Sequence, residues 1–186
     1  VQKTKLPKWL MKEKEILAIW DDHDYGLNDG GKDYPYKEES QNMFLNFWEI
    51  PANDPRNSRE GLYFKTVKNI EETNIEIIAL DTRYFRSKLN GKKNAYMPNT
   101  NPQATILGKK QWDWFESSIT NSTASVIIVL SSIQVLATDH PYEKWANFPL
   151  ERSKLIRILS EAAQNKTIII VSGDRHRSGI YQNNFF

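Results

Sequence analysis

An apolar run that leads directly into acidic residues is the most constraining feature of this 186-residue chain. Residues 16–20 form such a run, and Asp21, Asp22, His23 and Asp24 follow it without a break. Strands of open α/β sheets commonly present polar side chains at their C-terminal ends, where ligands bind. The sequence therefore predicts a buried strand over residues 16–20 with a functional site at its end.

The close spacing of these acidic residues needs a physical explanation. Three ionised carboxylates would repel one another in a pocket of low dielectric. A divalent cation would remove that repulsion, and His23 would then serve as a further ligand or as a general acid. A solvated, Asp-rich turn is the alternative, because Asp and Gly both favour turns.

Three later apolar segments also end in polar residues. They are residues 75–80, followed by Asp81, Thr82 and Arg83; residues 126–130, followed by Ser131, Ser132 and Gln134; and residues 168–171, followed by Ser172, Gly173, Asp174, Arg175 and His176. Helices are predicted over residues 109–119 and 150–164, where apolar residues recur at helical spacing. This alternation predicts an α/β fold whose strand ends converge on one pocket.

The remaining segments predict a hairpin, a further helix and two long loops. Residues 61–80 contain two apolar runs separated by a turn, which is typical of a β-hairpin. Residues 38–48 have aromatic residues at helical spacing. Residues 26–37 and 86–105 are rich in Gly, Pro and Asn and are predicted to be loops.

Composition is that of an ordinary folded protein and excludes several kinds of site. The length suits one domain over residues 1–186, and the net charge of +2 gives no strong signal for a nucleic-acid or membrane surface. No apolar run approaches the roughly 18 residues of a transmembrane helix. The absence of Cys excludes disulfides and thiolate metal sites.

Two pairs of residues suggest binding sites, and each has a simpler interpretation. Asp174 and His176 are two residues apart, so on an extended chain both side chains would point the same way and could bind Zn, Mn, Fe or Ca. The alternative is an ordinary surface turn. Asp81 and Arg83 form either a structural ion pair or a phosphate site, since the planar guanidinium binds phosphate well.

Several segments, taken in order, resemble the PhoD-like (alkaline phosphatase D) metallophosphatases of the calcineurin-like superfamily. They span about residues 16–180 and are Trp20-Asp21-Asp22-His23-Asp24, Leu80-Asp81-Thr82-Arg83, Leu107-Gly108 with Gln111-Trp112, Trp145-Ala146-Asn147-Phe148-Pro149 with Glu151-Arg152, and Ser172-Gly173-Asp174-Arg175-His176. The resemblance implies a two-sheet α/β sandwich flanked by helices that hydrolyses small phosphate esters at a dinuclear metal centre. The family's first metal motifs have no counterpart here, so it also implies the C-terminal part of a domain that requires an N-terminal half.

The resemblance further implies roles for individual residues. Asp22, Asp174 and His176 would be ligands of divalent or trivalent metal ions, with Zn, Mn, Fe and Ca as candidates. His23 would contact the phosphate or protonate the leaving oxygen, and Asp24 would orient His23.

Charge neutralisation on the substrate requires cations near these residues. Arg83 and Arg175 are the candidates, because each lies within one of the polar clusters. The family resemblance also implies a secreted or periplasmic protein, although the chain begins at Val1 with no signal peptide.

Two other functions remain open from the sequence. A metal-dependent nuclease or nucleotide phosphodiesterase would use the same residues, although the near-neutral charge disfavours long nucleic acids. A non-catalytic, aromatic-rich module could instead bind a sugar or a partner protein through Trp112, Trp145 and Tyr96.

Overall fold

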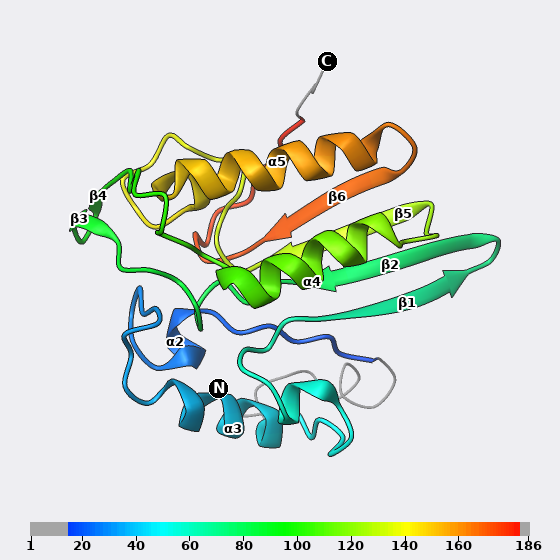
Figure 1. The fold of residues 1–186 in the computed structure, drawn as a ribbon, viewed down its shortest axis with the longest axis horizontal. Coiled ribbons are helices and arrows are strands. Elements are labelled where there is room, and N and C mark those ends of the chain that lie inside the picture. The colour runs from blue at the N-terminus through cyan, green and yellow to red at the C-terminus, as the bar shows by residue number, and fades with distance from the viewer. Residues whose placement is uncertain (1–14, 183–186) are drawn as a thin grey trace.

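The computed structural model describes residues 15–182 as a mixed α/β fold built on a four-stranded sheet (Figure 1). In spatial order its strands are β1 (Phe64–Ile70), β2 (Thr73–Ala79), β5 (Val126–Ser131) and β6 (Thr167–Ser172). β1 and β2 form an antiparallel hairpin, whereas β2, β5 and β6 run parallel. The predicted α/β class is confirmed, and the parallel pairing brings three C-terminal strand ends to one edge.

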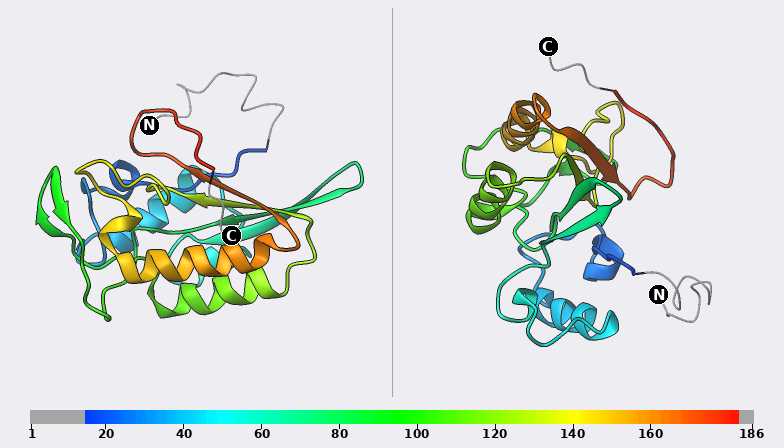
Figure 2. Two further views of the ribbon diagram at one scale, coloured as in Figure 1. Left: turned by 90° about the horizontal axis from the view of Figure 1, so that it is seen from above. Right: turned by 90° about the vertical axis from the view of Figure 1, so that its right-hand side faces the viewer.

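Two helices cover one face of this sheet (Figure 2). They are α4 (Gly108–Thr120) and α5 (Pro149–Ala163), close to the predicted bounds, and a short 3₁₀ helix, η3 (Trp145–Asn147), precedes α5. The core between helices and sheet includes Trp112, Phe115 and Ile119 of α4, Leu155 and Leu159 of α5, and Ile78, Ile127 and Val129 of the strands. No helix within residues 15–182 is long and apolar enough to span a membrane.

A second apolar cluster lies beside the sheet and supports the segment that carries Asp21 and Asp22. Its elements are α2 (Asp22–Tyr25), α3 (Lys37–Phe47) and a 3₁₀ helix, η2 (Pro55–Asn57). Its buried residues are Trp20, Tyr25, Phe44, Leu45, Leu62 and Tyr84. The predicted helix near residues 38–48 is thus confirmed as α3, and it helps to hold the acidic segment in place.

The strand predicted over residues 16–20 is wrong. This segment forms no ladder with another described strand. Residues 16–19 are only partly buried, and Trp20 is buried by side-chain packing instead: its ring lies edge-on to Tyr25, with ring centres 4.9 Å apart, and to Phe44 at 5.8 Å. An apolar run signals burial, and burial here does not require pairing with a neighbouring strand.

The predicted loop over residues 86–105 contains a short hairpin of β3 (Asn90–Lys92) and β4 (Ala95–Met97). This two-stranded ribbon is the other sheet of the described residues. It projects beyond the edge of the main sheet where β2, β5 and β6 end (Figure 1).

The face of the sheet opposite α4 and α5 is also apolar. Ile77, Ile128 and Ile169 are register partners across β2, β5 and β6 and therefore form a row on that face. Ile169 is 43% exposed and Val171 is 50% exposed. Parallel strands are usually covered on both faces, and within residues 15–182 no helix covers this one.

Candidate metal centre

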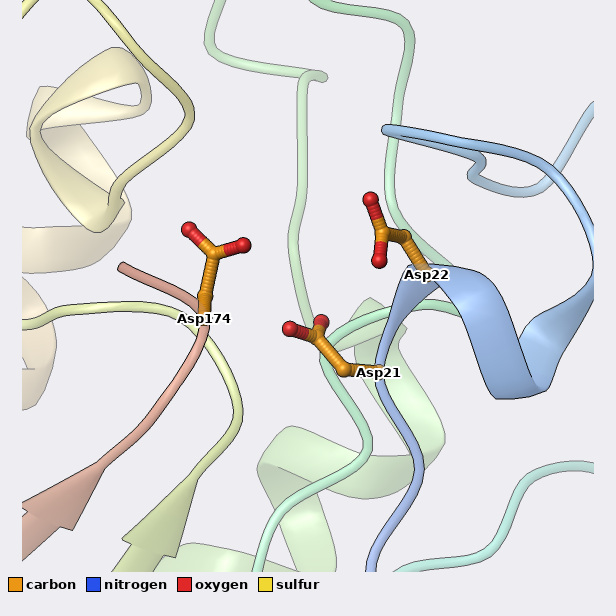
Figure 3. Close-up of side chains that lie close together, drawn as sticks. All are labelled: Asp21, Asp22 and Asp174. Carbon is orange, nitrogen blue, oxygen red and sulfur yellow. The ribbon is translucent and has the colours of Figure 1, made fainter. Parts of the chain in front are cut away.

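Three carboxylates from opposite ends of the described chain meet at the C-terminal edge of the sheet (Figure 3). Asp21, Asp22 and Asp174 each offer one oxygen atom, and these oxygens all lie within 4.8 Å of one another. Asp22 is buried, and the other two are partly buried. Several carboxylate oxygens at this spacing are the ligand type that hard divalent cations prefer.

Asp22 is held by backbone groups of its own segment. It opens the single turn of α2, which ends at Gly26 with φ 117°, a value that favours glycine. The His23 N–H donates to Asp22 Oδ1 at 2.6 Å, and the Asp29 N–H donates to Oδ2 at 3.1 Å. The carboxylate therefore has a fixed orientation before any ligand binds.

Asp21 is held by a buried arginine. The Nε of Arg83 donates to Asp21 Oδ1 at 2.8 Å, and Nη1 donates to Glu143 Oε2 at 2.5 Å. Glu143 also pairs with Arg86, at 2.9 Å between Nε and Oε1. Burial lowers the pKa of Arg83, but the Glu143 and Asp21 carboxylates outweigh burial and raise it overall.

Arg83 pairs with residues other than the one that the sequence suggested. Its side chain is fully buried, contacts Asp21 and Glu143, and is not part of the cavity wall described below, so the phosphate contact expected of it stays a prediction. The alternative ion pair with Asp81 is wrong. The Asp81 carboxylate accepts the backbone N–H groups of Arg83, Tyr84 and Leu62, which closes the turn after β2.

Asp174 reaches the cluster from the end of β6. Burial, followed by repulsion from Asp21 and Glu143, raises its pKa to about 6. The extended geometry expected for residues 174–176 is wrong, because Asp174 and His176 both have positive φ, at 66° and 50°. Asp174 therefore joins the carboxylate cluster, whereas His176 does not lie among the clustered ligand atoms.

A cavity of about 560 Å³ opens above the three carboxylates. Its wall includes all the predicted site residues except Arg83, namely Asp22, His23, Asp24, Asp174, Arg175 and His176. The His23 side chain is 85% exposed, with Nε2 3.9 Å from Asp22 Oδ1. No hydrogen bond joins it to Asp24 in the described structure, because successive residues of the α2 turn point in directions about 100° apart.

The rest of the wall includes residues that sequence reasoning did not select for this site. Glu143 and Tyr142 come from the loop before η3, and the Arg175 guanidinium stacks on the Tyr142 ring at 3.6 Å from its centre. Lys93 and Tyr96 come from the β3–β4 hairpin. No sequence motif in the loop before η3 or in the β3–β4 hairpin indicates a role in the site, because their position beside it depends on the tertiary fold.

The tryptophans proposed for an aromatic binding surface belong to the core. Trp112 is 4% exposed and its Nε1 donates to Glu151 at 2.7 Å. Trp145 is fully buried and its Nε1 donates to Ser131 at 2.9 Å. A binding surface built on these two residues is therefore excluded, and Tyr96 lines the cavity above the three carboxylates instead.

The chain matches known proteins in both sequence and fold. A family model described as PhoD-like phosphatase matches residues 9–184. Alkaline phosphatase D of Bacillus subtilis (strain 168) is 25% identical over 186 aligned residues, which cover 87% of this chain and 31% of that protein. A solved structure described as "Structure of PhoD" shares the fold, with a TM-score of 0.59 and 22% identity over 85% of this chain and 34% of the other. The chain thus spans about a third of the length of these relatives. Because the family model covers almost all of its residues, this chain belongs to the PhoD-like phosphatase family.

Proposed function

We propose that this chain carries part of the active site of a metal-dependent phosphoric ester hydrolase. The supporting observation is the convergence of Asp21, Asp22 and Asp174 at the wall of a cavity, in a chain of the PhoD-like phosphatase family. The whole protein would act on a small phosphate ester, either a monoester or a diester.

The donor set fits a hard cation. The cluster offers three carboxylate oxygens and no nitrogen or sulfur, which suits Mn, Ca or Fe and also accommodates Zn. Asp22 and Asp174 would hold the ion as predicted, with Asp21 as an added ligand, and His176 would bind a second ion of a dinuclear centre. Bound cations of this kind polarise phosphoryl oxygens and lower the pKa of water.

The protein's own side chains would position the substrate and move the proton. His23, exposed to the cavity, would protonate the leaving oxygen. Arg175, held against Tyr142 by stacking, would neutralise charge on the phosphate. Arg83 would orient Asp21, and Asp24 would remain at the cavity wall as a partner for His23.

We also propose that residues 1–186 form one domain unit that is completed by an N-terminal half. Two facts support this: the chain spans about a third of its relatives, and one face of its sheet remains partly exposed. The secreted or periplasmic location implied by the family resemblance stays a prediction.

The test is metal content and ester hydrolysis in the same preparation. The complete protein that contains this chain would be loaded with Mn, Zn, Fe or Ca, dialysed, and measured by elemental mass spectrometry. It would then be assayed with p-nitrophenyl phosphate and bis(p-nitrophenyl) phosphate. Asp22→Asn and Asp174→Asn should lose bound metal and hydrolysis together, whereas Asp113→Asn on the exposed surface of α4 should keep both. Failure of the complete wild-type protein to retain any of the four metals would contradict the proposal.

A further inference from the structure

We propose that Lys93, at the turn of the β3–β4 hairpin, is a substrate-binding residue that attracts the anionic ester into the metal cavity. Lys93 and Asn94 connect β3 to β4, and both line the cavity. This inference rests on the proposed hydrolase function and adds a specificity-determining residue to it.

The cavity needs such a cation because its wall is acidic. Its carboxylates are Asp21, Asp22, Asp24, Asp29, Glu143 and Asp174. Arg83 pairs with Asp21 and Glu143, and Arg86 pairs with Glu143. Both arginines are buried, and neither lines the cavity. A phosphate ester approaching from solvent therefore meets repulsion from carboxylates before it reaches a bound metal, and a cation at the wall reduces that repulsion.

Within the described cavity wall, the positively charged Lys and Arg side chains are those of Lys93 and Arg175. The two differ in the contacts that they make with other residues. Arg175 stacks on Tyr142. Lys93 is exposed and forms no ion pair, hydrogen bond or aromatic contact with another residue of 15–182. Its ammonium group is therefore available to an incoming anion.

The hairpin that carries Lys93 is fastened to two walls of the cavity. The Tyr96 hydroxyl donates to Asp29 Oδ2 at 2.7 Å, and the Tyr96 N–H donates to Pro141 O at 3.1 Å. Burial, together with the Asp29 contact, raises the pKa of Tyr96, so the hydroxyl remains a donor. Lys93 thus lies three residues from a fixed point, which limits where its ammonium group can reach.

Lys92 provides a matched control for the experiment. It is adjacent in sequence, also exposed and of the same charge, but it is the last residue of β3 and does not line the cavity, whereas Lys93 lies in the turn. Comparing Lys93→Ala with Lys92→Ala therefore separates a cavity contact from a general effect of net charge.

The first readout is binding of inorganic phosphate to the Mn²⁺-loaded complete protein that contains this chain, measured by isothermal titration calorimetry. Lys93→Ala should weaken phosphate binding about tenfold, as expected for loss of a charge-assisted contact. Lys92→Ala should bind like the wild type, and Lys93→Arg should restore most of the affinity. In p-nitrophenyl phosphate hydrolysis, Lys93→Ala should raise KM by a similar factor and change kcat less than about twofold, since the contact is made in ground and transition state alike.

Each outcome decides between the two proposals. Equal phosphate binding by the Lys93→Ala and Lys92→Ala variants overturns the role of Lys93 even if the wild type hydrolyses esters. A complete wild-type protein that binds phosphate through Lys93 but hydrolyses no ester supports Lys93 as an anion-binding residue and contradicts the hydrolase. A complete protein that neither binds phosphate nor hydrolyses esters contradicts both.

Discussion

The Arg83 guanidinium donates two hydrogen bonds to a single oxygen of Asp21, one from Nε at 2.8 Å and one from Nη2. Within residues 15–182, no hydrogen bond is made by the second oxygen of Asp21, which remains available to a cation. Arg83 is itself fixed by Glu143, which is 1% exposed. A metal ligand candidate is therefore oriented by a buried ionic network rather than by its own loop.

Arg83→Met should damage both stability and metal binding. The change leaves the Glu143 and Asp21 carboxylates without this partner, and breaking a buried pair in this way typically costs about 3–5 kcal/mol. Loss of the orienting contact should also weaken Mn²⁺ binding about 10–100-fold. Urea unfolding and metal titration would measure the two effects.

The matched control is Arg157→Met. Arg157 pairs with Glu161 on the solvent-facing side of α5, with both side chains about 60% exposed. Such surface pairs contribute roughly 0.3–0.5 kcal/mol, so this variant should unfold close to the wild type. Equal destabilisation by the two substitutions would contradict a special role for Arg83.

Metal affinity should depend on pH through Asp174, whose pKa is raised to about 6 by burial and by the neighbouring carboxylates. Below that pH the carboxyl keeps its proton, and a metal ion must displace it. Apparent Mn²⁺ affinity should therefore fall by up to about tenfold per pH unit below pH 6 and level off above it. Metal titrations at several pH values on both sides of the Asp174 pKa of about 6 would show the step.

The Asp174→Asn variant tests whether this pH-dependent step in Mn²⁺ affinity is caused by Asp174. It should bind Mn²⁺ more weakly and without the pH dependence near 6, whereas Asp113→Asn, at a 62% exposed position, should retain it. A step that persists in Asp174→Asn would contradict its assignment to Asp174.

The main helices and parallel strands were predictable because their signals are local. Trp112, Phe115 and Ile119 recur at helical spacing, and the run of residues 168–171 is apolar throughout. The convergence of Asp22 with Asp174 was predicted on the ground that both follow parallel strands, which holds for Asp174 after β6 but not for Asp22 in α2. Residues 16–20 misled the prediction, since Trp20 is buried by aromatic packing and not in a sheet.

The partners of Arg83 were not predictable from the sequence. Asp21 is 62 residues away and Glu143 is 60 residues away, so no spacing rule connects them. The nearer Asp81 offered a simple pair, but its carboxylate is occupied by backbone N–H groups of the turn. Long-range ion pairs depend on tertiary placement, and local patterns do not contain that information.

Tyr96→Phe should loosen the hairpin from the cavity wall. It removes the hydroxyl that donates to Asp29, at a cost of about 1 kcal/mol for an ordinary hydrogen bond. Phosphate binding should weaken, and Lys93→Ala should have a smaller effect in the Tyr96→Phe background than in the wild type. Calorimetry on the four members of this double-mutant cycle measures the coupling. Tyr36→Phe, at a 60% exposed position, is the control. Additive effects of Tyr96→Phe and Lys93→Ala would contradict the anchoring role of Tyr96.

The exposed apolar row on β6 predicts that this chain binds hydrophobic probes. Ile169 is 43% exposed and Val171 is 50% exposed, beside Ile128 and Ile77 on a face with no covering helix in residues 15–182. The double change Ile169→Thr and Val171→Thr removes exposed apolar surface but leaves the core contacts under α5 in place. The variant should therefore bind less anilinonaphthalene sulfonate, seen as lower dye fluorescence. It should also self-associate less in analytical ultracentrifugation. Leu150→Thr, an isolated residue at 52% exposure, should change neither. If Ile169 and Val171 instead contribute to the core, the double variant will unfold at lower urea concentration and bind more of the dye, which would show that this face is covered.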